Sequence, residues 1–275
     1  MQFERVRPSG ELSAHVEWFW GMRSSARKPE QQKIVPDGFP EVIFHFGDPY
    51  RIQLDRRWQR QASALLGGQL KHHFFLENTG RTDMFGITFR PAALTHLFDL
   101  NMGDYAGRVV ALRQVHGPWA QLVAKLSAHT AFSDRVSATE NWLRARTGQI
   151  PAHPIDSCLE ILFRDHGTTT IQQLCQEAGV TERQLQRYFQ HYIGVSPKFY
   201  ARTIRFSYLF SLIQGGQTSW SDVVFLSGYY DQSHFIRDFK AFTGEDPTRF
   251  QYREETMTGF FTHKKGSRMS GLSNP

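Results

Sequence analysis

The sequence has 275 residues, of which 40% are hydrophobic and 21% charged, and its formal net charge is +6. This length suits two domains of ordinary size, and the hydrophobic content excludes a globally disordered chain. No apolar run is long enough to cross a bilayer and the N-terminus lacks the features of a signal peptide, so we expect a cytoplasmic protein. Cys158 and Cys175 form no CxxC motif, which argues against a disulfide framework and a structural zinc site.

The positive charge is distributed unevenly along the chain. Residues 1–150 carry 19 Lys and Arg against 14 Asp and Glu, whereas residues 151–255 carry 10 against 12. The last twenty residues add three basic side chains and no acidic one. Because the C-terminal part is not basic as a whole, any attraction to phosphate there must come from a few well-placed arginines and from helix N-termini.

Between residues 35 and 90 the sequence alternates short apolar segments with turn residues, a pattern typical of a small β-barrel or sandwich. The segment from Glu41 to Phe46 is one example, and it ends in the turn signal Gly47-Asp48-Pro49. Helical patterns follow at residues 92–100, 119–128 and 132–147. Their apolar stripes could supply a dimer surface or could cover the barrel of their own domain.

The run GQIPAHP at 148–154 interrupts the helical pattern, and we place the domain boundary there. The expected fold class is α+β. It combines a β-rich, barrel-like domain with appended helices at 1–150 and an all-α domain at 151–255. The Gly-, Ser- and Lys-rich segment 256–275 is expected to be a flexible tail.

Helix starts are well marked after residue 151. Thr170 with Gln173, and Thr181 with Gln184, fit the capping box, in which two side chains satisfy each other's free backbone N–H groups. Ser196-Pro197 predicts the start of a long helix that ends at Gly215-Gly216. Such a helix spans roughly 27 Å. That length can hold two recognition helices about 34 Å apart, which is one turn of B-DNA.

Two segments in this half combine an apolar face with a face that carries DNA-reading side chains. Arginine can bind guanine O6 and N7 with two hydrogen bonds, and glutamine can pair similarly with adenine. One such face is typical of any solvated helix, but two, each after a capped helix and a glycine-containing turn, indicate two helix-turn-helix units. The outward-facing residues are Arg183, Gln186 and Arg187 in the first segment, and Gln232, His234 and Arg237 in the second.

Residues from about 155 to 252 resemble the DNA-binding domain of the AraC family of bacterial transcription regulators. The most specific part runs from Gly228 to Phe250 and includes GYYDQSHF at 228–235. The resemblance implies a seven-helix domain with two helix-turn-helix units, double-stranded DNA as its partner, and RNA polymerase as a second partner. The DNA contacts that it implies are Arg183, Gln186, Arg187, Gln232, Ser233, His234 and Arg237.

The N-terminal half resembles, more faintly, the cupin-like sensing domain that precedes this reader in many family members. The similar pieces are the segments 35–38, 42–47 and 86–91. In such relatives this domain binds a small effector or mediates homodimerisation, so the resemblance implies one of these two roles here. It specifies no ligand.

Two residues of the N-terminal half are candidates for effector binding. His45, between two phenylalanines, could line a barrel interior, although a half-buried core histidine is the ordinary alternative. Arg90 could place a cation at a pocket mouth, although it could equally be a surface arginine before a helix. His72, His73 and Glu77 are not expected to bind metal, because adjacent histidines on a strand point to opposite faces. We expect no metal and no cofactor.

The leading hypothesis is a regulator that reads DNA and responds to a small effector, and that is not an enzyme. Two alternatives stay open. One is a metal-dependent cupin-type enzyme with an accessory helical domain, which bound transition metal in the purified protein would support. The other is a protein-interaction module, which strongly salt-dependent, sequence-selective duplex binding would contradict.

Overall fold

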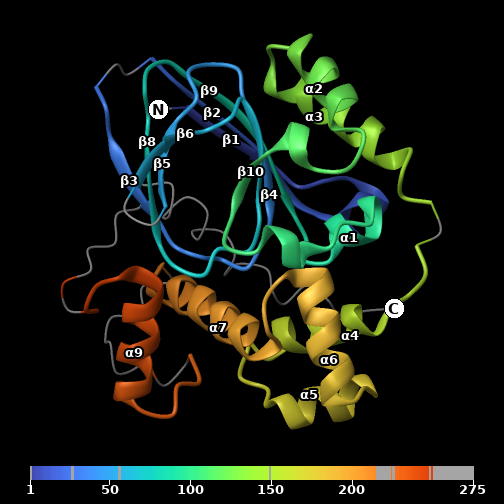
Figure 1. The fold of residues 1–275 in the computed structure, drawn as a ribbon, viewed down its shortest axis with the longest axis vertical. Helices are drawn as coiled ribbons and strands as arrows, with labels where there is room; N and C mark the ends of the chain where they lie inside the picture. Colours follow the sequence, from blue (N-terminus) through green and yellow to red (C-terminus); the bar gives the residue numbers. More distant parts are fainter. Residues whose placement is uncertain are drawn as a thin grey trace.

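The structure is a computed structural model that describes residues 2–25, 28–54, 57–148, 150–214, 224, 227–247 and 249. It consists of a β-rich N-terminal part and a helical C-terminal part, which lie one above the other in Figure 1. This is the α+β fold class expected from the sequence. The tail at 256–275 and the predicted helix end at Gly215-Gly216 lie outside the described residues.

The described strands of the β-rich part pair in an antiparallel manner and form two sheets. The larger sheet has the order β1-β2-β9-β4-β7-β10 and the smaller one the order β3-β8-β5-β6. The larger sheet comprises β1 (Gln2–Val6), β2 (Val16–Ser24), β9 (Thr82–Phe89), β4 (Glu41–His45), β7 (Ala64–Gly67) and β10 (Val109–Ala111). The smaller one comprises β3 (Gln31–Ile34), β8 (Phe74–Glu77), β5 (Arg51–Leu54) and β6 (Arg57–Arg60). Neither sheet follows chain order, so its pairings join segments that are distant in the sequence.

Strand β4 shows how alternation divides side chains between the two faces of the larger sheet. Val42 and Phe44 are buried in a core that also contains residues of the appended helices. Ile43 packs into a second core, which is formed by residues of both sheets. His45 lies two positions after Ile43, so its side chain points into the space between the sheets.

Three helices cover the outer face of the larger sheet: α1 (Ala93–Phe98), α2 (Trp119–Ser127) and α3 (Phe132–Arg144). They correspond to the three helical patterns in the sequence. Phe98, Trp119 and Trp142 form an aromatic cluster with ring centroids 4.4 to 5.6 Å apart. Leu122 and Leu126 are fully buried in the same core. The apolar stripes of these helices therefore cover the sheet of their own domain.

The helical part begins with α4 (Pro154–Arg164), α5 (Ile171–Ala178) and α6 (Glu182–Tyr188), followed by a π-helical turn, η4 (Phe189–Ile193). The long α7 (Pro197–Gln214) leads to α9 (Gln232–Thr243). Both predicted capping boxes are present, at Thr170 with Gln173 and at Thr181 with Gln184. No described helix combines the length and the apolarity that crossing a membrane would need.

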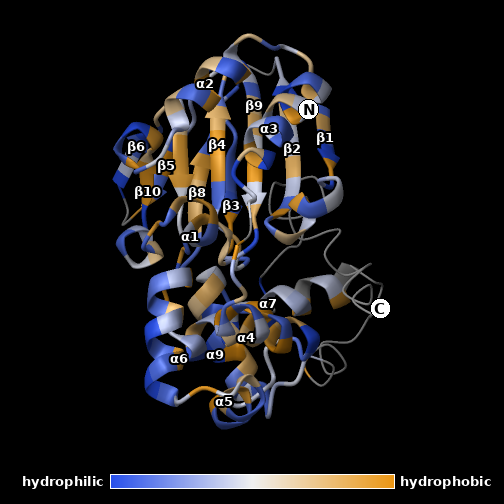
Figure 2. Ribbon diagram, turned by 90° about the vertical axis from the view of Figure 1, so that its right-hand side faces the viewer, coloured by the Kyte–Doolittle hydropathy of each residue, from blue (hydrophilic) through white to orange (hydrophobic). Residues whose placement is uncertain are grey.

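The two parts of the molecule are in direct contact. The hydroxyl of Tyr200 on α7 donates a hydrogen bond of 3.1 Å to the carbonyl oxygen of Gly38, in the loop before β4. His96 on α1 contacts Asp156 on α4, with 2.9 Å between the ring Nε2 and a carboxylate oxygen. Val35 of the β-rich part is buried in a cluster with Phe206 and other side chains of α7 and α9. The helical part is therefore seated against one end of the sandwich (Figure 2).

Candidate nucleic-acid interface

The first helix-turn-helix unit consists of α5 and α6. Leu174 on α5 and Leu185 on α6 are fully buried in one cluster, so the two helices share a core. Gly179 between them has a φ of +64°, a left-handed conformation that glycine adopts without strain. This glycine ends α5 and lets the chain turn into the second helix of the unit.

Helix α6 presents a polar face to solvent. Arg183, Gln186 and Arg187 are all exposed, as the sequence predicts for a recognition helix. In Figure 2, α6 lies at the outer side of the helical part and is largely hydrophilic. At its start, the amide oxygen of Gln184 accepts a hydrogen bond of 2.9 Å from the backbone N–H of Thr181. The capping box thus fixes the first turn of the helix, where base edges are reached.

The second recognition segment is α9. The carboxylate of Asp231 caps this helix by accepting a hydrogen bond of 2.7 Å from the backbone N–H of His234. Gln232, Ser233 and Arg237 are exposed, and they stand opposite a buried aromatic face. Between Gln214 and Ser227, Val224 is the one residue that the structure describes. Of the second unit, the described part is therefore chiefly its recognition helix, α9.

His234 differs from the other candidate contacts because it is only half-exposed. Its ring lies 5.2 Å from that of Tyr229, and its Nε2 lies 3.8 Å from a carboxylate oxygen of Asp238. Part of the His234 ring therefore faces Tyr229 and Asp238 rather than solvent. Among the predicted contacts of α9, it has the least surface free for a base or a phosphate.

Asp238 is a key residue of this helix that the sequence interpretation missed. Its side chain is 2% exposed and accepts hydrogen bonds of 2.7 and 3.1 Å from the guanidinium of Arg202 on α7. This ion pair joins the recognition helix to the helix that connects the two units. The signal in the sequence was an acidic residue on the aromatic face of α9, three positions after Phe235.

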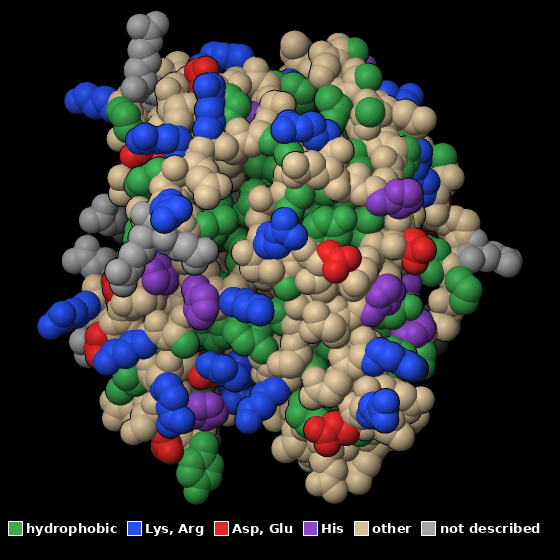
Figure 3. All heavy atoms as spheres, viewed as in Figure 1, with side chains coloured by type: hydrophobic (Ala, Val, Ile, Leu, Met, Phe, Trp, Pro, Cys, Tyr) green, Lys and Arg blue, Asp and Glu red, His purple; other side chains and the backbone are tan. Residues whose placement is uncertain are grey.

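Helix α7 lies between α6 and α9 in the chain. It has 18 residues, which corresponds to about 27 Å at the usual rise of an α-helix. Lys and Arg side chains lie over both parts of the face shown in Figure 3, with acidic side chains among them. This pattern agrees with the sequence, in which the helical half has no general excess of positive charge. The exposed arginine and glutamine side chains predicted from the sequence lie on α6 and α9.

The two candidate effector residues, His45 and Arg90, are not brought together. His45 is opposite Met84 in the β4–β9 register, whereas Arg90 follows the other end of β9. Six residues of extended chain correspond to about 20 Å. Arg90 lies 3.4 Å from a carboxylate oxygen of Glu17. The two residues therefore belong to opposite ends of the sandwich.

His45 is buried between the sheets. Its Nε2 lies 3.1 Å from the amide oxygen of Gln61, and its buried Nδ1 has no hydrogen-bond partner among the described residues. Burial lowers the pKa of His45 to about 4, because desolvation disfavours the charged ring. At neutral pH the ring is therefore uncharged and acts as a hydrogen-bonding group.

His72 and His73 lie before β8 rather than on a strand, so the expectation that they occupy opposite faces of one strand is wrong. Both lie against α9 and its end. His72 Nδ1 is 3.4 Å from the carbonyl oxygen of Ala241, and the ring of His73 closely approaches Gly244. Glu77 instead pairs with Arg51. Across the described residues, no cluster of three or more His, Cys, Asp or Glu side chains could hold a metal ion.

Two protein families match the chain, one in each half. The family described as "Helix-turn-helix domain" matches residues 174–253, and the family described as "Domain of unknown function (DUF6597)" matches residues 4–111. A curated relative is the HTH-type transcriptional activator RhaR of Klebsiella pneumoniae subsp. pneumoniae. It is 23% identical over 206 residues, which are 74% of this chain and 66% of the relative. Residues 174–253 thus match a helix-turn-helix family, and the chain is similar to an HTH-type transcriptional activator.

Two solved structures resemble the fold only loosely. ToxT from Vibrio cholerae has a TM-score of 0.47 at 13% identity, covering 90% of this chain and 97% of ToxT. The AraC-like transcriptional activator CuxR has a TM-score of 0.25 at 13% identity, covering 76% of this chain and 87% of CuxR. The alignment with RhaR spans just under two thirds of that relative's length.

Proposed function

We propose that this protein is a sequence-specific transcription regulator of the AraC type, whose helices α6 and α9 enter adjacent major grooves on one face of DNA. The observation that carries the proposal is a pair of capped helices with exposed arginine and glutamine faces, joined by α7. Each face is backed by a buried core, and its polar side chains, apart from half-exposed His234, are exposed to solvent. This geometry fits direct reading of base edges.

The contacts we assign are Arg183, Gln186, Arg187, Gln232, Ser233, His234 and Arg237. In a complex with DNA, the exposed arginines would bind guanine edges or phosphates, and the glutamines would bind adenine. The N-termini of both helices would add partial positive charge toward the phosphates. Domain limits at 1–150 and 151–255 remain part of this proposal.

Regulation is the second part of the proposal. The β-rich domain would bind a small effector and alter the pose of the reader through the direct contacts between the two parts. We take activation as the output, which is the role in the name of RhaR, with RNA polymerase as the protein partner and the cytoplasm as the location. Because the stripes of α2 and α3 are buried within the domain, homodimerisation would use another surface.

Selection of DNA fragments tests this function. Wild-type protein and Arg187→Ala/Arg237→Ala are incubated with sheared genomic DNA, and the retained fragments are sequenced. We expect a motif of two blocks about one helical turn apart, lost in the variant. Each single substitution should weaken specific binding by about 1–3 kcal/mol if the arginine reads a base.

Lys28→Ala/Lys125→Ala is the matched control, because both lysines are exposed on the β-rich part and the loss of charge is the same. It should retain the motif. Absence of a motif with the wild-type protein, with and without cell extract as a source of effector, would contradict the proposal. Equal loss in the control would instead assign the binding to net charge alone.

A further inference from the structure

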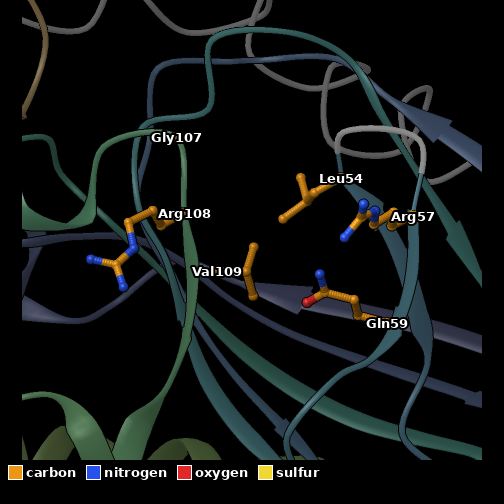
Figure 4. A pocket seen from close by; sticks show the side chains of 6 residues that line it. All are labelled: Leu54, Arg57, Gln59, Gly107, Arg108 and Val109. Carbon is orange, nitrogen blue, oxygen red and sulfur yellow. The ribbon is translucent and has the colours of Figure 1, made fainter.

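The sandwich has an open side between the described edge strands of its two sheets, β6 and β10. Two adjoining hollows lie there, with volumes of about 520 and 410 Å³, and they share Leu54, Gln59 and Val109. We call this region the seam. In Figure 4, Leu54 and Val109 face each other across it, with Arg57 and Gln59 on one side, whereas the side chain of Arg108 on the other side points away from it. Its size is that of an ordinary small-molecule site.

The charged side chains that line the seam are all positive. It contains the arginines Arg57, Arg60, Arg108 and Arg113, and none of its lining residues is acidic. The other polar side chains are glutamines at positions 59, 61 and 114. Guanidinium groups bind carboxylate and phosphate oxygens through paired charge-assisted hydrogen bonds. A cluster of this kind therefore favours an anion.

These arginines also differ from most others in the β-rich domain by lacking acidic partners. Seven others lie within 4 Å of a carboxylate: Arg7, Arg23, Arg51, Arg81, Arg90, Arg135 and Arg144. Within the described ranges, Arg57, Arg60 and Arg113 form no ion pair, and Arg108 donates only to the backbone oxygen of Asp104. Arg146, after the end of α3, likewise has no carboxylate partner and donates instead to oxygens of Trp142 and Gln121. Four arginines without a carboxylate partner are nevertheless gathered at the seam.

The floor of the seam is apolar and connects to the interior. Ile52 and Leu65 are buried and line the second hollow, together with Leu54 and Val109. Gln61 lines the same hollow and is hydrogen-bonded to His45, between the sheets. A ligand in the seam would therefore contact a side chain that is joined to the central strand β4.

We propose that the seam binds a small organic anion, with its carboxylate or phosphate group on Arg57, Arg60 and Arg113 and its apolar body on Leu54, Val109 and Leu65. Such a ligand would bridge the edges β6 and β10 and shift the hydrogen bond between Gln61 and His45. The control of DNA binding by this ligand rests on the proposed function, whereas the binding itself does not.

A simpler explanation of the same arginines is that they keep two exposed strand edges from pairing with other chains. That role needs charge but no apolar floor and no hollow. It also predicts no preference among small anions. The two explanations therefore differ in whether an amphipathic anion binds with a defined stoichiometry.

Titration calorimetry on the full chain separates them. The probes are hexanoate, hexyl phosphate, inorganic phosphate and the neutral 1-hexanol. We expect one molecule of hexanoate or hexyl phosphate per chain, and the tighter of the two identifies the anionic group. Binding should weaken about tenfold or more in Arg57→Gln/Arg113→Gln, because two charge-assisted contacts are lost.

Lys28→Gln/Lys125→Gln removes the same charge from exposed positions away from the seam and should bind like the wild type. The proposal is overturned if neither alkyl anion binds, if 1-hexanol binds as well as the anions, or if the control loses as much affinity. Circular dichroism checks that both variants are folded. Fragment selection with the same proteins tests DNA reading independently, so a failure of the seam and a failure of the proposed function are distinguishable.

Discussion

At the scale of single residues, the roles of buried polar groups depend on their partners. Asp238 and His45 are both buried, yet their environments differ in kind. The carboxylate of Asp238 is compensated by the guanidinium of Arg202, whereas the ring of His45 has only the amide of Gln61. The first arrangement stabilises a charge, and the second keeps a titratable group neutral.

Asp238→Ala should therefore destabilise the helical domain. The substitution leaves Arg202 without its partner at a partly buried site, and we expect a loss of roughly 3 kcal/mol in the free energy of unfolding. Urea denaturation followed by circular dichroism measures it. Glu177→Ala breaks an exposed ion pair with Arg164 and should cost less than about 1 kcal/mol. Equal losses in the free energy of unfolding would show that the buried ion pair contributes no more stability than the exposed one.

His45 should make the stability of the protein depend on pH in acid. As the pH falls below 6.5, the unfolded chain takes up a proton on this residue, whereas the folded protein does so only near its lowered pKa of about 4. Stability is therefore lost as the pH falls through this window, by about 3 kcal/mol in full. His45→Asn lacks this contribution, so its free energy of unfolding should fall less steeply. Parallel curves for the two proteins would contradict the lowered pKa.

At the scale of elements, short helices depend on their ends. Helix α6 has only seven residues, too few to be stable alone in water. It is held by the burial of Leu185 and by the capping box of Thr181 with Gln184. The buried Leu185 and the capping box also orient the exposed arginines on the outer face of α6. Loss of the cap should thus affect recognition as well as stability.

Thr181→Ala should cost about 1 kcal/mol of stability, because the backbone N–H of Gln184 loses its acceptor. The measurement is thermal unfolding, combined with titration of the selected DNA duplex. Affinity should fall together with stability, since Arg183 lies in the first turn of α6. Thr181→Ser keeps the hydroxyl and should restore both quantities. A variant with normal affinity would mean that the first turn is not needed for DNA binding.

At the scale of the whole molecule, the position of the reader depends on the sandwich. Gly38 has a φ of +91°, and its carbonyl oxygen accepts hydrogen bonds from Tyr200 on α7 and from Gln69. His96 and Asp156 make a second polar contact between the two parts. Both α7 and the start of α4 are therefore anchored to the β-rich domain.

Tyr200→Phe should weaken this anchoring with little other change. The ring can keep its buried position, and the carbonyl oxygen of Gly38 keeps its hydrogen bond to Gln69, so we expect a cost of about 1 kcal/mol. Limited proteolysis between the two parts should become faster. Tyr230→Phe is the matched control, because Tyr230 is 94% exposed, and it should leave both stability and proteolysis unchanged. An unaltered Tyr200→Phe protein would contradict a role of this hydrogen bond in docking.

Much of the fold and of the candidate interface could be predicted from local signals. Helix caps, glycine turns and apolar periodicity act over three to eight neighbouring residues, so the sequence already indicates α5, α6, α7 and α9. The outward faces of α6 and α9 follow from the same periodicity. His234 was expected to face outward but is only half-exposed. Its contact with Tyr229 depends on the packing of the whole unit, which local periodicity does not predict.

By itself, the sequence determined that two capped helices with arginine and glutamine faces follow a β-rich domain. Only the tertiary structure decided which distant groups meet: Asp238 with Arg202, Tyr200 with the carbonyl oxygen of Gly38, and His45 with Gln61. The reason is the range of the interactions. Backbone preferences depend on near neighbours along the chain, whereas ion pairs, burial and hollows depend on strand order, and here that order joins segments tens of residues apart.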